Sequence, residues 1–339
     1  MKVVFITESS HEIGLGHLKR CLSLAFEFEK DRVFDIEIII PVCNEKTREM
    51  LEEQSFAYHS ASKRLDFFLN LEKSKLILIV DVKTNFYDEF LEKMSQKSVK
   101  IFGIDDLSHR NTLFTANFSP PAAVIPDAFE FEQREKNYIG WEWVPIHIPS
   151  STVALNQEKR YEYSALMLFG GSDPAALSAP SFDYFGRNVP EIDFSLICGP
   201  LMKSSAIVEC KRISRRYSNL KVIESPGNLS ALMHKSFASI TTFGHTFYEL
   251  IAHGNSPLAI YRDIEDVLGL FCNPDLVENN LVSITQYREL MRNNEPKFLT
   301  KFWSSMKKPI GSIDPSIQDV ATQLRRGSTN IKKVISNLI

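Results

Sequence analysis

Short apolar runs alternate with amphipathic segments along this 339-residue chain. The runs lack the polar alternation of half-exposed strands, and the segments between them space their apolar residues as helices do. Continuous apolar strands separated by helices indicate a parallel sheet that is covered on both faces. In the first half, the pattern predicts strands over Lys2–Thr7, Ile36–Pro41, Leu76–Val80 and Val99–Ile104, and helices over Leu18–Phe28, Thr47–Gln54 and Tyr87–Ser95.

The same alternation begins again after a proline-rich stretch, residues 119–158, that we interpret as an irregular crossover. The strands predicted beyond it are Ser164–Phe169, Asp193–Cys198, Leu220–Ile223, Ala238–Thr242 and Leu258–Tyr261. Asn228 is expected to cap a helix that runs through His234. Gly244 is expected to open a helix through His253. Asp314 and Pro315 have the order of an N-cap and a first helical residue, which predicts a helix through Arg326, followed by a last helix over Thr329–Leu338.

The chain is therefore predicted to be an α/β protein with two doubly wound, Rossmann-like domains in series. We expect an N-terminal domain over residues 1–148, a C-terminal domain over residues 149–310, and C-terminal helices over residues 311–339 that can pack back on the N-terminal domain. In open parallel sheets, ligands bind at the loops that follow the carboxyl ends of the strands.

The amino-acid composition limits the kinds of ligand and the cellular location that we expect for this protein. Hydrophobic residues make up 44% and charged residues 24%, which is ordinary for a globular chain. Lys and Arg number 39 against 42 Asp and Glu, so there is no overall basic field and duplex nucleic acid is not expected as a partner. The five cysteines are scattered, which argues against a disulfide framework or structural zinc and for a cytoplasmic location. No apolar run is long enough for a transmembrane helix.

A glycine-containing loop follows the first predicted strand. Gly14 and Gly16 allow a tight turn and a close backbone approach to a ligand. The helix behind them offers free N–H groups and partial positive charge to an anion. His17 is placed at the helix start, where an imidazole can act as a base near neutral pH. The alternative is that the glycines only shape a turn and that His17 caps it.

The segment Gly14-Leu15-Gly16-His17, with Arg20 and Cys21 after it, resembles the N-terminal signature of the UDP-sugar hydrolases of the pseudaminic acid pathway. It is also similar to the related spore-coat polysaccharide proteins and, more distantly, to the UDP-GlcNAc transferase that forms lipid II. The resemblance implies a GT-B fold, a nucleotide-sugar cleft between two domains with the nucleotide mostly on the C-terminal one, and a catalytic role for His17. It places Gly14, Gly16 and Arg20 among the substrate-binding residues and implies neither a cofactor nor a metal.

Further similar segments occur in the same order over about residues 1–285. Asp105 and Asp106 resemble the acid pair at the end of a strand, which makes them catalytic candidates beside His17. Segments that resemble the nucleotide-binding parts of these proteins contribute Gly170, Gly171, Ser172, Asp173, Asn228, Leu229, Gly244, His245, Thr246 and Glu249.

These nucleotide-side matches have a chemical logic. Gly170, Gly171 and Ser172 leave backbone N–H groups and a hydroxyl where a diphosphate would approach. The helix that begins after Gly244 offers its own N–H groups to phosphate. Glu249, one turn further on, could accept hydrogen bonds from two ribose hydroxyls. The alternatives are an ordinary turn after the strand and a solvated glutamate.

The sugar side departs from these proteins. Asp81-Val82-Lys83 stands where the hydrolases carry Asp-His-Tyr, so a tyrosine expected near the substrate is missing. Tyr261-Arg262-Asp263-Ile264-Glu265 stands where they carry Asn-Gln, and His245 replaces a small hydroxyl residue. The nucleotide-binding architecture is therefore better supported than the identity of the sugar.

Several other residues have two interpretations. Asp105 and Asp106 could position a sugar or cap the loop after them. Trp141 and Trp143 could stack on a sugar, but packing at a domain interface is favoured. His109-Arg110 is favoured as a surface pair, and the basic residues from Lys211 to Arg216 as a solvated helix face.

Together these observations predict an enzyme that cleaves the bond between the anomeric carbon of a sugar and a nucleoside diphosphate. A hydrolase of nonulosonic acid or surface-polysaccharide biosynthesis is the first hypothesis. One alternative is a glycosyltransferase that uses a UDP- or CMP-linked sugar and a glycan acceptor. The other is a nucleotide-sugar binding protein that has lost catalysis.

Overall fold

A computed structural model describes residues 1–41, 44–60, 65, 68, 76–121, 134–149, 164–236, 238–255, 257–261, 283–286 and 315–339. The contacts within the chain divide it into two compact units. Unit 1 comprises Met1–His147 and Leu324–Ile339, and unit 2 comprises Ile148–Gln323.

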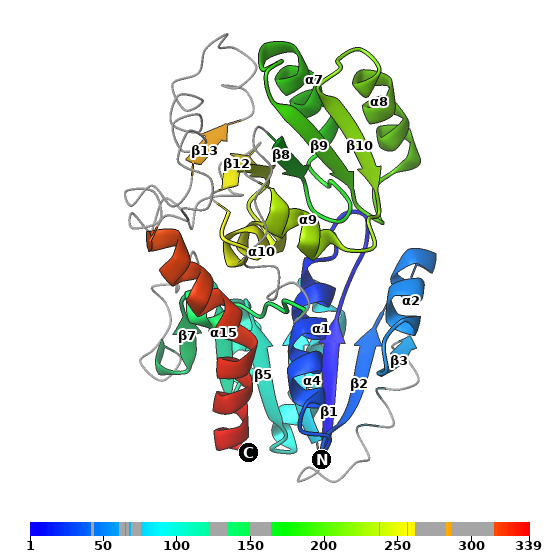
Figure 1. Ribbon diagram of the computed structural model, residues 1–339. Helices are drawn as coiled ribbons and strands as arrows, with labels where there is room; N and C mark the ends of the chain where they lie inside the picture. The colour runs from blue at the N-terminus through cyan, green and yellow to red at the C-terminus, as the bar shows by residue number, and fades with distance from the viewer. Residues whose placement is uncertain are drawn as a thin grey trace. The chain divides into compact units, whose positions relative to one another are not determined.

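Unit 1 is built on a seven-stranded parallel sheet with the order β3-β2-β1-β4-β5-β6-β7 (Figure 1). Its strands are β1 (Lys2–Thr7), β2 (Asp35–Ile40), β3 (Ala57–Ser60), β4 (Leu76–Asp81), β5 (Lys100–Ile104), β6 (Ala116–Ser119) and β7 (Asn137–Ile139). Its helices include α1 (Gly16–Glu29), α2 (Glu45–Glu52), α4 (Asp88–Gln96) and the short 3₁₀ turns η2 (Asn85–Tyr87), η3 (His109–Leu113) and η4 (Trp141–Trp143).

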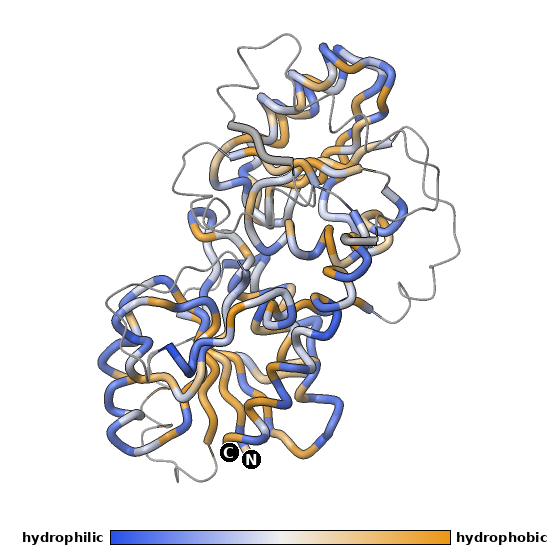
Figure 2. Tube along the Cα trace, turned by 90° about the vertical axis from the view of Figure 1, so that its left-hand side faces the viewer, coloured by the Kyte–Doolittle hydropathy of each residue, from blue (hydrophilic) through white to orange (hydrophobic). Residues whose placement is uncertain are grey.

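Alternate residues of the central strands face opposite helical layers. Val4 and Ile6 of β1 pack in one cluster with Leu91 and Met94 of α4. On the other face, Phe5 meets Phe28 of α1 with ring centroids 6.3 Å apart. Figure 2 shows these strands as a hydrophobic centre between helices of mixed hydropathy. The predicted doubly wound fold is confirmed.

Unit 2 repeats the design with a six-stranded parallel sheet in the order β10-β9-β8-β11-β12-β13. The strands are β8 (Ser164–Leu168), β9 (Asp193–Cys198), β10 (Leu220–Glu224), β11 (Ala238–Thr241), β12 (Pro257–Tyr261) and β13 (Ser283–Gln286). The helices are α7 (Ser178–Asn188), α8 (Ser204–Ser214), α9 (Leu229–Lys235) and α10 (His245–Ala252). Ala165 and Met167 of β8 face the cluster that holds α7 and α8, whereas Leu166 and Leu168 face Met233 of α9 and Leu250 of α10.

Both sheets reverse their strand order beside the first strand of the unit. In unit 1, the chain moves outward from β1 through β2 to β3 and returns to β4 on the other side of β1. In unit 2, the corresponding reversal lies between β8 and β11. Ligands of open α/β sheets bind at such switch points, outside the carboxyl ends of the strands. The loops after β1 and β4, and those after β8 and β11, are therefore where the chemistry is expected.

The C-terminal segment differs from its prediction. It forms one helix, α15 (Pro315–Leu338), rather than two helices separated near Gly327. Gly327 does not end a helix here. It brings α15 close to the backbone of unit 1, and a Cβ atom at this position would lie 2.0 Å from the carbonyl oxygen of Val144. The next residue, Ser328, donates a hydrogen bond of 3.1 Å from Oγ to the Ile146 carbonyl.

The stretch over residues 119–158 is less irregular than predicted where the structure describes it. β7 extends the sheet beside β6, with Phe118 opposite Tyr138. Trp143 packs against the rings of Tyr138 and Phe118, with centroid distances of 5.0 and 5.9 Å. Trp143 therefore packs within unit 1 itself. Residues 122–133 and 150–158 of this stretch lie outside the described residues.

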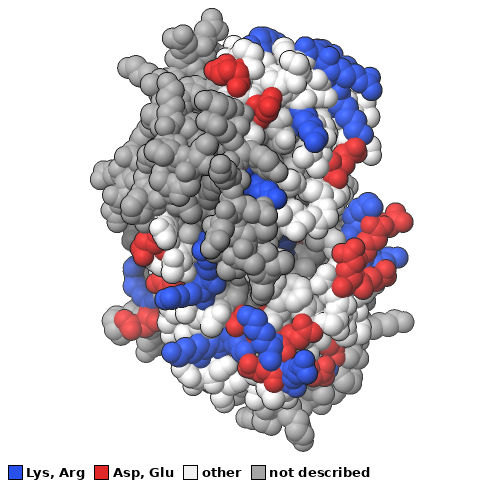
Figure 3. Space-filling model, in the orientation of Figure 1, with Lys and Arg blue, Asp and Glu red and all other residues white. Residues whose placement is uncertain are grey.

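Charged side chains of both signs are mixed on the face in Figure 3. The basic residues of α8 pair with nearby carboxylates: Arg212 Nε lies 2.7 Å from Glu209 and Lys211 Nζ lies 2.5 Å from Glu224. The prediction of a solvated helix face is confirmed. Within the described part of the chain, every helix is too short or too polar to cross a bilayer.

Candidate functional site

The loop between β1 and α1 makes a tight turn that depends on Gly14. The Gly14 N–H donates to the Ser10 carbonyl at 2.9 Å, and Gly14 has a φ of 82°, in the left-handed region that favours glycine. Ser10 Oγ accepts hydrogen bonds from the N–H groups of Glu12 and Ile13 at 3.1 Å each. The turn delivers the chain to α1, which begins at Gly16, so His17 lies in the first turn of the helix.

His17 contacts a carboxylate that the sequence analysis did not assign to the site. Its Nδ1 atom lies 2.5 Å from Oδ1 of Asp81, the last residue of β4. Because β1 and β4 are neighbours with Thr7 opposite Asp81, the start of α1 and the end of β4 meet at the switch point of the sheet. His17 is 7% exposed and Asp81 is fully buried.

This contact fixes the tautomer of His17. Burial would raise the pKa of Asp81, but Arg20 and then His17 outweigh burial and lower that pKa to about 2. The carboxylate is therefore ionised at neutral pH. Arg20 Nη2 also lies 3.1 Å from Nδ1, but the shorter contact of 2.5 Å with the carboxylate favours a proton on Nδ1. In the neutral imidazole, Nε2 then has a lone pair and can accept a proton. No group in the described ranges forms a hydrogen bond with Nε2.

Arg20 holds the carboxylate from the other side. Its Nε donates to Asp81 Oδ2 at 2.7 Å and its Nη2 to Asp81 Oδ1 at 2.8 Å, a bidentate pair. Its Nη1 donates to Asp105 Oδ2 at 3.0 Å. Arg20, one turn after His17, thus links the carboxyl ends of β4 and β5. Its guanidinium is engaged by carboxylates, so we interpret it as a positioning residue instead of a direct substrate ligand.

Asp105 is connected to His17 and Asp81 through its hydrogen bond from Arg20. It follows β5 with a φ of 55°, an unusual conformation for a residue other than glycine and one often found at functional sites. Desolvation raises the pKa of Asp105 against the opposing effect of Arg20.

The depressed pKa of Asp81 makes a prediction about stability. An aspartate in an unfolded chain titrates near 3.8, so the carboxylate stabilises the fold fully above pH ~4 and loses that contribution as the pH falls through ~2. The loss amounts to about 2 kcal/mol. We expect the difference in free energy of unfolding between the wild type and Asp81→Asn to shrink by about this amount between pH 7 and pH 2.

Denaturant unfolding at a series of pH values measures this difference. Asp193→Asn is the matched control, because Asp193 is exposed at the start of β9. The difference in free energy of unfolding between the wild type and Asp193→Asn should stay nearly constant across this pH range. A difference for Asp81→Asn that is equally constant would show that the buried ion pair does not hold the pKa down.

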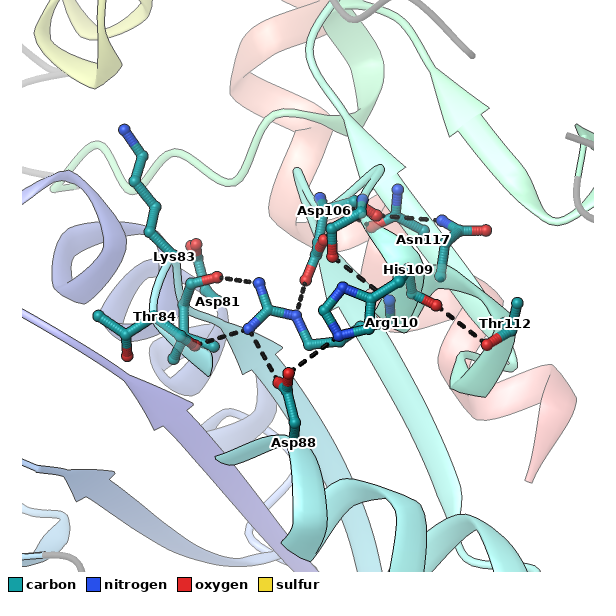
Figure 4. A network of polar contacts seen from close by, with 12 residues as sticks. Asp81, Lys83, Thr84, Asp88, Asp106, His109, Arg110, Thr112 and Asn117 are labelled. Atoms are coloured by element: carbon teal, nitrogen blue, oxygen red, sulfur yellow. Dashed lines mark hydrogen bonds and ion pairs between the residues drawn. The ribbon is translucent and has the colours of Figure 1, made fainter. Parts of the chain in front are cut away.

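Asp106 belongs to a second network, which Figure 4 shows. Its Oδ2 accepts from Arg110 Nε at 2.8 Å and its Oδ1 from the Ser108 N–H at 3.0 Å. Arg110 donates in turn to the carbonyls of Thr84 and Val82, at 2.7 and 2.9 Å. Since both carboxylate oxygens of Asp106 hold protein groups, we propose a positioning role for it in place of the catalytic one.

The prediction of a surface pair is wrong for Arg110 and right for His109. Arg110 is 3% exposed, because the guanidinium satisfies two backbone carbonyls and two carboxylates that lie around it. The His109 side chain is 62% exposed and contacts Asp88 at 2.9 Å.

In unit 2, the glycine-rich loop after β8 leaves a buried hydroxyl without a partner. Gly170 has a φ of 79°, and a Cβ atom there would meet no described atom within 4 Å. The Gly171 carbonyl accepts from the Leu201 N–H at 2.9 Å, which fixes the loop against the end of β9. Ser172 is 6% exposed, and its Oγ has no hydrogen-bond partner among the residues that the structure describes.

Asp173 and Asn228 have local roles in the structure. The Asp173 carboxylate accepts from the N–H groups of Leu177 and Ser178 at 2.9 and 3.0 Å, at the start of α7. Asn228 caps α9 through the Ala231 N–H at 2.9 Å, as predicted, and Leu229 packs on the apolar cluster below. These contacts shape the loops near the switch point, and a direct role of either polar side chain in nucleotide binding remains a proposal.

The start of α10 lies at the switch point of the same sheet. Gly244 is extended, with open space where a Cβ atom would be within the described chain, and α10 begins at His245, followed by Thr246. Glu249 is one turn later; its side chain is only 17% exposed, and its Oε1 lies 3.8 Å from His245 Nε2. Glu249 is therefore not the solvated residue of the alternative interpretation. Residues 262–265, where the sequence departs from the hydrolases, lie outside the described residues.

Asp81 is the residue that sequence reasoning missed. It was placed at the end of a predicted strand, but the partner of His17 was sought in the Asp105-Asp106 pair. The strand order supplies the missing signal: in a sheet whose order reverses beside β1, the strand that returns there is β4, and its terminal carboxylate faces the loop after β1.

Comparison with known sequences gives two weak relatives, and no family model matches the chain. An uncharacterized protein of Methanocaldococcus jannaschii, MJ1062, is 23% identical over 275 residues, which cover 78% of this chain and 56% of that protein. The chain thus spans about half the length of this relative. The UDP-2,4-diacetamido-2,4,6-trideoxy-beta-L-altropyranose hydrolase of Campylobacter jejuni is 25% identical over 244 residues, 70% of this chain and 82% of the hydrolase.

Solved structures with the same architecture cover nearly the whole chain. HepE of Anabaena, solved in complex with UDP, has a TM-score of 0.62 at 13% identity and covers 99% of both chains. The UDP-GlcNAc 2-epimerase of Methanocaldococcus jannaschii has a TM-score of 0.60 at 12% identity, over 99% of this chain and 100% of the epimerase. MurG of Acinetobacter baumannii has a TM-score of 0.58 at 10% identity, again over 99% and 100%. The chain therefore has the two-domain α/β architecture of GT-B type that these proteins share.

Proposed function

We propose that this protein is an enzyme that acts on a UDP-linked sugar at the anomeric carbon, with hydrolysis as its reaction. The observation that supports it best is the His17–Asp81 pair, which leaves Nε2 of a buried imidazole free to accept a proton at the switch point of unit 1. The weak similarity to a UDP-sugar hydrolase and the order of matched segments agree with this chemistry.

In the proposed reaction, His17 Nε2 takes a proton from water while the water oxygen forms a bond to the anomeric carbon. The bond between that carbon and the diphosphate oxygen breaks, and its electron pair leaves with UDP. The proton passes from His17 to solvent or to the departing diphosphate. Asp81 stabilises the imidazolium that forms in between, as a buried carboxylate beside a catalytic histidine does in other enzymes.

Unit 2 is assigned the leaving group. The N–H groups of Gly171 and Ser172 and those at the start of α10 are donors suited to a diphosphate, and they act without reorganisation because the loops are already in place. The buried Ser172 hydroxyl, which lacks a partner in the described structure, would gain one from a phosphate oxygen. Glu249 is proposed to accept hydrogen bonds from the ribose.

A glycosyltransferase is the second candidate, and Lys83 is the observation that favours it, since the tyrosine of the hydrolases is absent there. His17 would then take the proton of an acceptor hydroxyl instead of water. Product analysis separates the possibilities: free sugar and UDP from donor alone indicate a hydrolase, and acceptor-dependent release of UDP indicates a transferase. A UDP-sugar with inverted configuration would indicate an epimerase, and binding without turnover a protein that has lost catalysis.

Nucleotide binding gives the most direct test of the proposal. UDP should raise the melting temperature, because a ligand that binds only the native state stabilises it. Ser172→Ala should weaken UDP binding by roughly three- to tenfold, the value of about 1 kcal/mol for one hydrogen bond. Ser181→Ala is the matched control, since Ser181 also has a buried Oγ that is unpaired in the described structure but lies inside α7.

Isothermal titration of UDP into the three proteins measures these differences. We expect unchanged UDP affinity for Ser181→Ala. An unchanged melting temperature of the wild type at millimolar UDP, UDP-sugars and CMP-sugars would contradict the assignment of a nucleotide site to unit 2.

A further inference from the structure

The loop after β4 is held through its backbone by two buried side chains of opposite charge. Glu8, which is 3% exposed, accepts hydrogen bonds from the Lys83 N–H and, at 3.4 Å, from the Thr84 N–H. Thr84 Oγ1 also donates to Glu8, at 3.0 Å. From the other side, Arg110 donates to the carbonyls of Val82 and Thr84. We call this arrangement of Glu8 and Arg110 around residues 82–84 the loop clamp.

The loop clamp satisfies the hydrogen bonds of two buried charged side chains mainly through the backbone of the loop. Burying a carboxylate and a guanidinium is unfavourable unless their hydrogen bonds are satisfied, and here most of those bonds go to the main chain of three consecutive residues. The loop begins directly after Asp81, so the clamp sets the position of whatever side chains follow the carboxylate that orients His17.

Two exposed side chains of different character are displayed by this fixed loop. Lys83 is exposed, and Figure 4 shows it extending away from Arg110 and the other labelled residues. No carboxylate in the described part of the chain pairs with its ammonium group. Phe86 is 59% exposed and is the one aromatic residue among the large exposed hydrophobic residues of the described chain. Its ring is held edge-on by Tyr87, with centroids 4.9 Å apart.

The Lys83 ammonium group can donate charge-assisted hydrogen bonds to a carboxylate or a phosphate. Phe86, three positions further along the loop, offers an exposed aromatic ring. Arg20, the other cation near this loop, already pairs with Asp81 and Asp105. It therefore does not compete with Lys83 for an anionic group of the ligand.

We propose that Lys83 is a specificity-determining residue that selects a sugar-side ligand, the transferred sugar or its acceptor, with a negatively charged carboxylate or phosphate group. This inference rests on the proposed function, because it assigns the chemical class of the group that reacts beside His17.

Three sugars that share one ring test the proposal: glucose, glucuronate and glucose 6-phosphate. Their affinities are measured by ligand-observed NMR titration, with the protein saturated with UDP. The wild type should bind at least one anionic sugar about tenfold more tightly than glucose, the usual value of a charge-assisted hydrogen bond. The glucuronate and phosphate titrations distinguish a carboxylate from a phosphate ligand.

Variants assign the preference to Lys83. Lys83→Gln should remove the preference, and Lys83→Glu should leave both anionic sugars weaker than glucose. Lys100→Gln is the matched control, since Lys100 is exposed at the start of β5, where the strands begin, whereas Lys83 follows the carboxyl end of β4. Melting curves check that each variant folds.

Equal affinities for the three sugars, or a preference that survives in Lys83→Gln, would overturn the inference. A separate UDP titration keeps this outcome distinct from a failure of the proposed function. Normal UDP binding without anion selectivity overturns only the role of Lys83, whereas absent UDP binding overturns the proposed function.

Discussion

Replacing His17 with asparagine is expected to lower turnover of the UDP-sugar substrate by on the order of 10²–10⁴-fold, the usual contribution of a positioned acid–base group. Asparagine keeps a hydrogen-bonding group near Asp81 but cannot accept a proton as the Nε2 atom of imidazole does. UDP affinity should change little, because the nucleotide is assigned to unit 2. The measurement combines the rate of UDP release with a UDP titration and a melting curve.

Asp81 and His109 supply the companion variants. Asp81→Asn should reduce turnover by a similar factor with little effect on UDP affinity, because an amide no longer requires the proton of His17 to sit on Nδ1. His109→Asn is the matched control: His109 is also paired with an aspartate, at 2.9 Å, but its side chain is 62% exposed. Full activity of a folded His17→Asn protein would show that His17 has only a structural role at the start of α1, and the base would then be sought at Asp105.

Gly327→Ala is expected to destabilise unit 1 by about 1–3 kcal/mol, with a fall in melting temperature of several degrees. Alanine is normally the better residue inside a helix by up to ~1 kcal/mol, so helix propensity predicts the opposite sign. The reason for the reversal is the Val144 carbonyl oxygen, which would lie 2.0 Å from the new Cβ atom and cannot move without its backbone.

Chemical denaturation of Gly327→Ala and Gly227→Ala measures this effect. Gly227 is the control, since a Cβ atom there would meet no described atom within 4 Å. We expect Gly227→Ala to be neutral or slightly stabilising. A gain in stability for Gly327→Ala would show that α15 does not approach the backbone of unit 1 as closely as described.

Sequence periodicity was sufficient for the fold because its strands are buried on both faces. Runs such as Leu76–Val80 have one interpretation in a doubly wound sheet, and β4 lies within one residue of its predicted bounds. Four short strands were not predicted: β3 and β7 at the two edges of the first sheet, β6 beside β7, and β13 at an edge of the second sheet. Each has only three or four residues and therefore little pattern of its own. The break predicted between Arg326 and Thr329 is wrong, because Gly327 lies inside α15 and serves a close backbone approach.

Within the candidate site, only residues whose position depends on nearby sequence could be predicted. His17 and the glycine loops follow from local sequence, because a turn and a helix start are local structures. The partner of His17 is 64 positions away, and its choice depends on which strand returns beside β1. Arg110 was assigned to the surface because two of its partners are backbone carbonyls of another loop, which no side-chain pattern reveals.

The loop clamp has a consequence for how this protein can diversify. Glu8 and Arg110 hold mainly N–H and carbonyl groups, which every residue except proline provides, so the path of the loop is largely independent of the side chain at position 83. A single codon change there can exchange one ligand preference for another while His17 and Asp81 stay in register. Relatives with this clamp would therefore tolerate rapid drift at one position beside an unchanged catalytic pair, and the same position offers a place to retarget the protein by saturation mutagenesis.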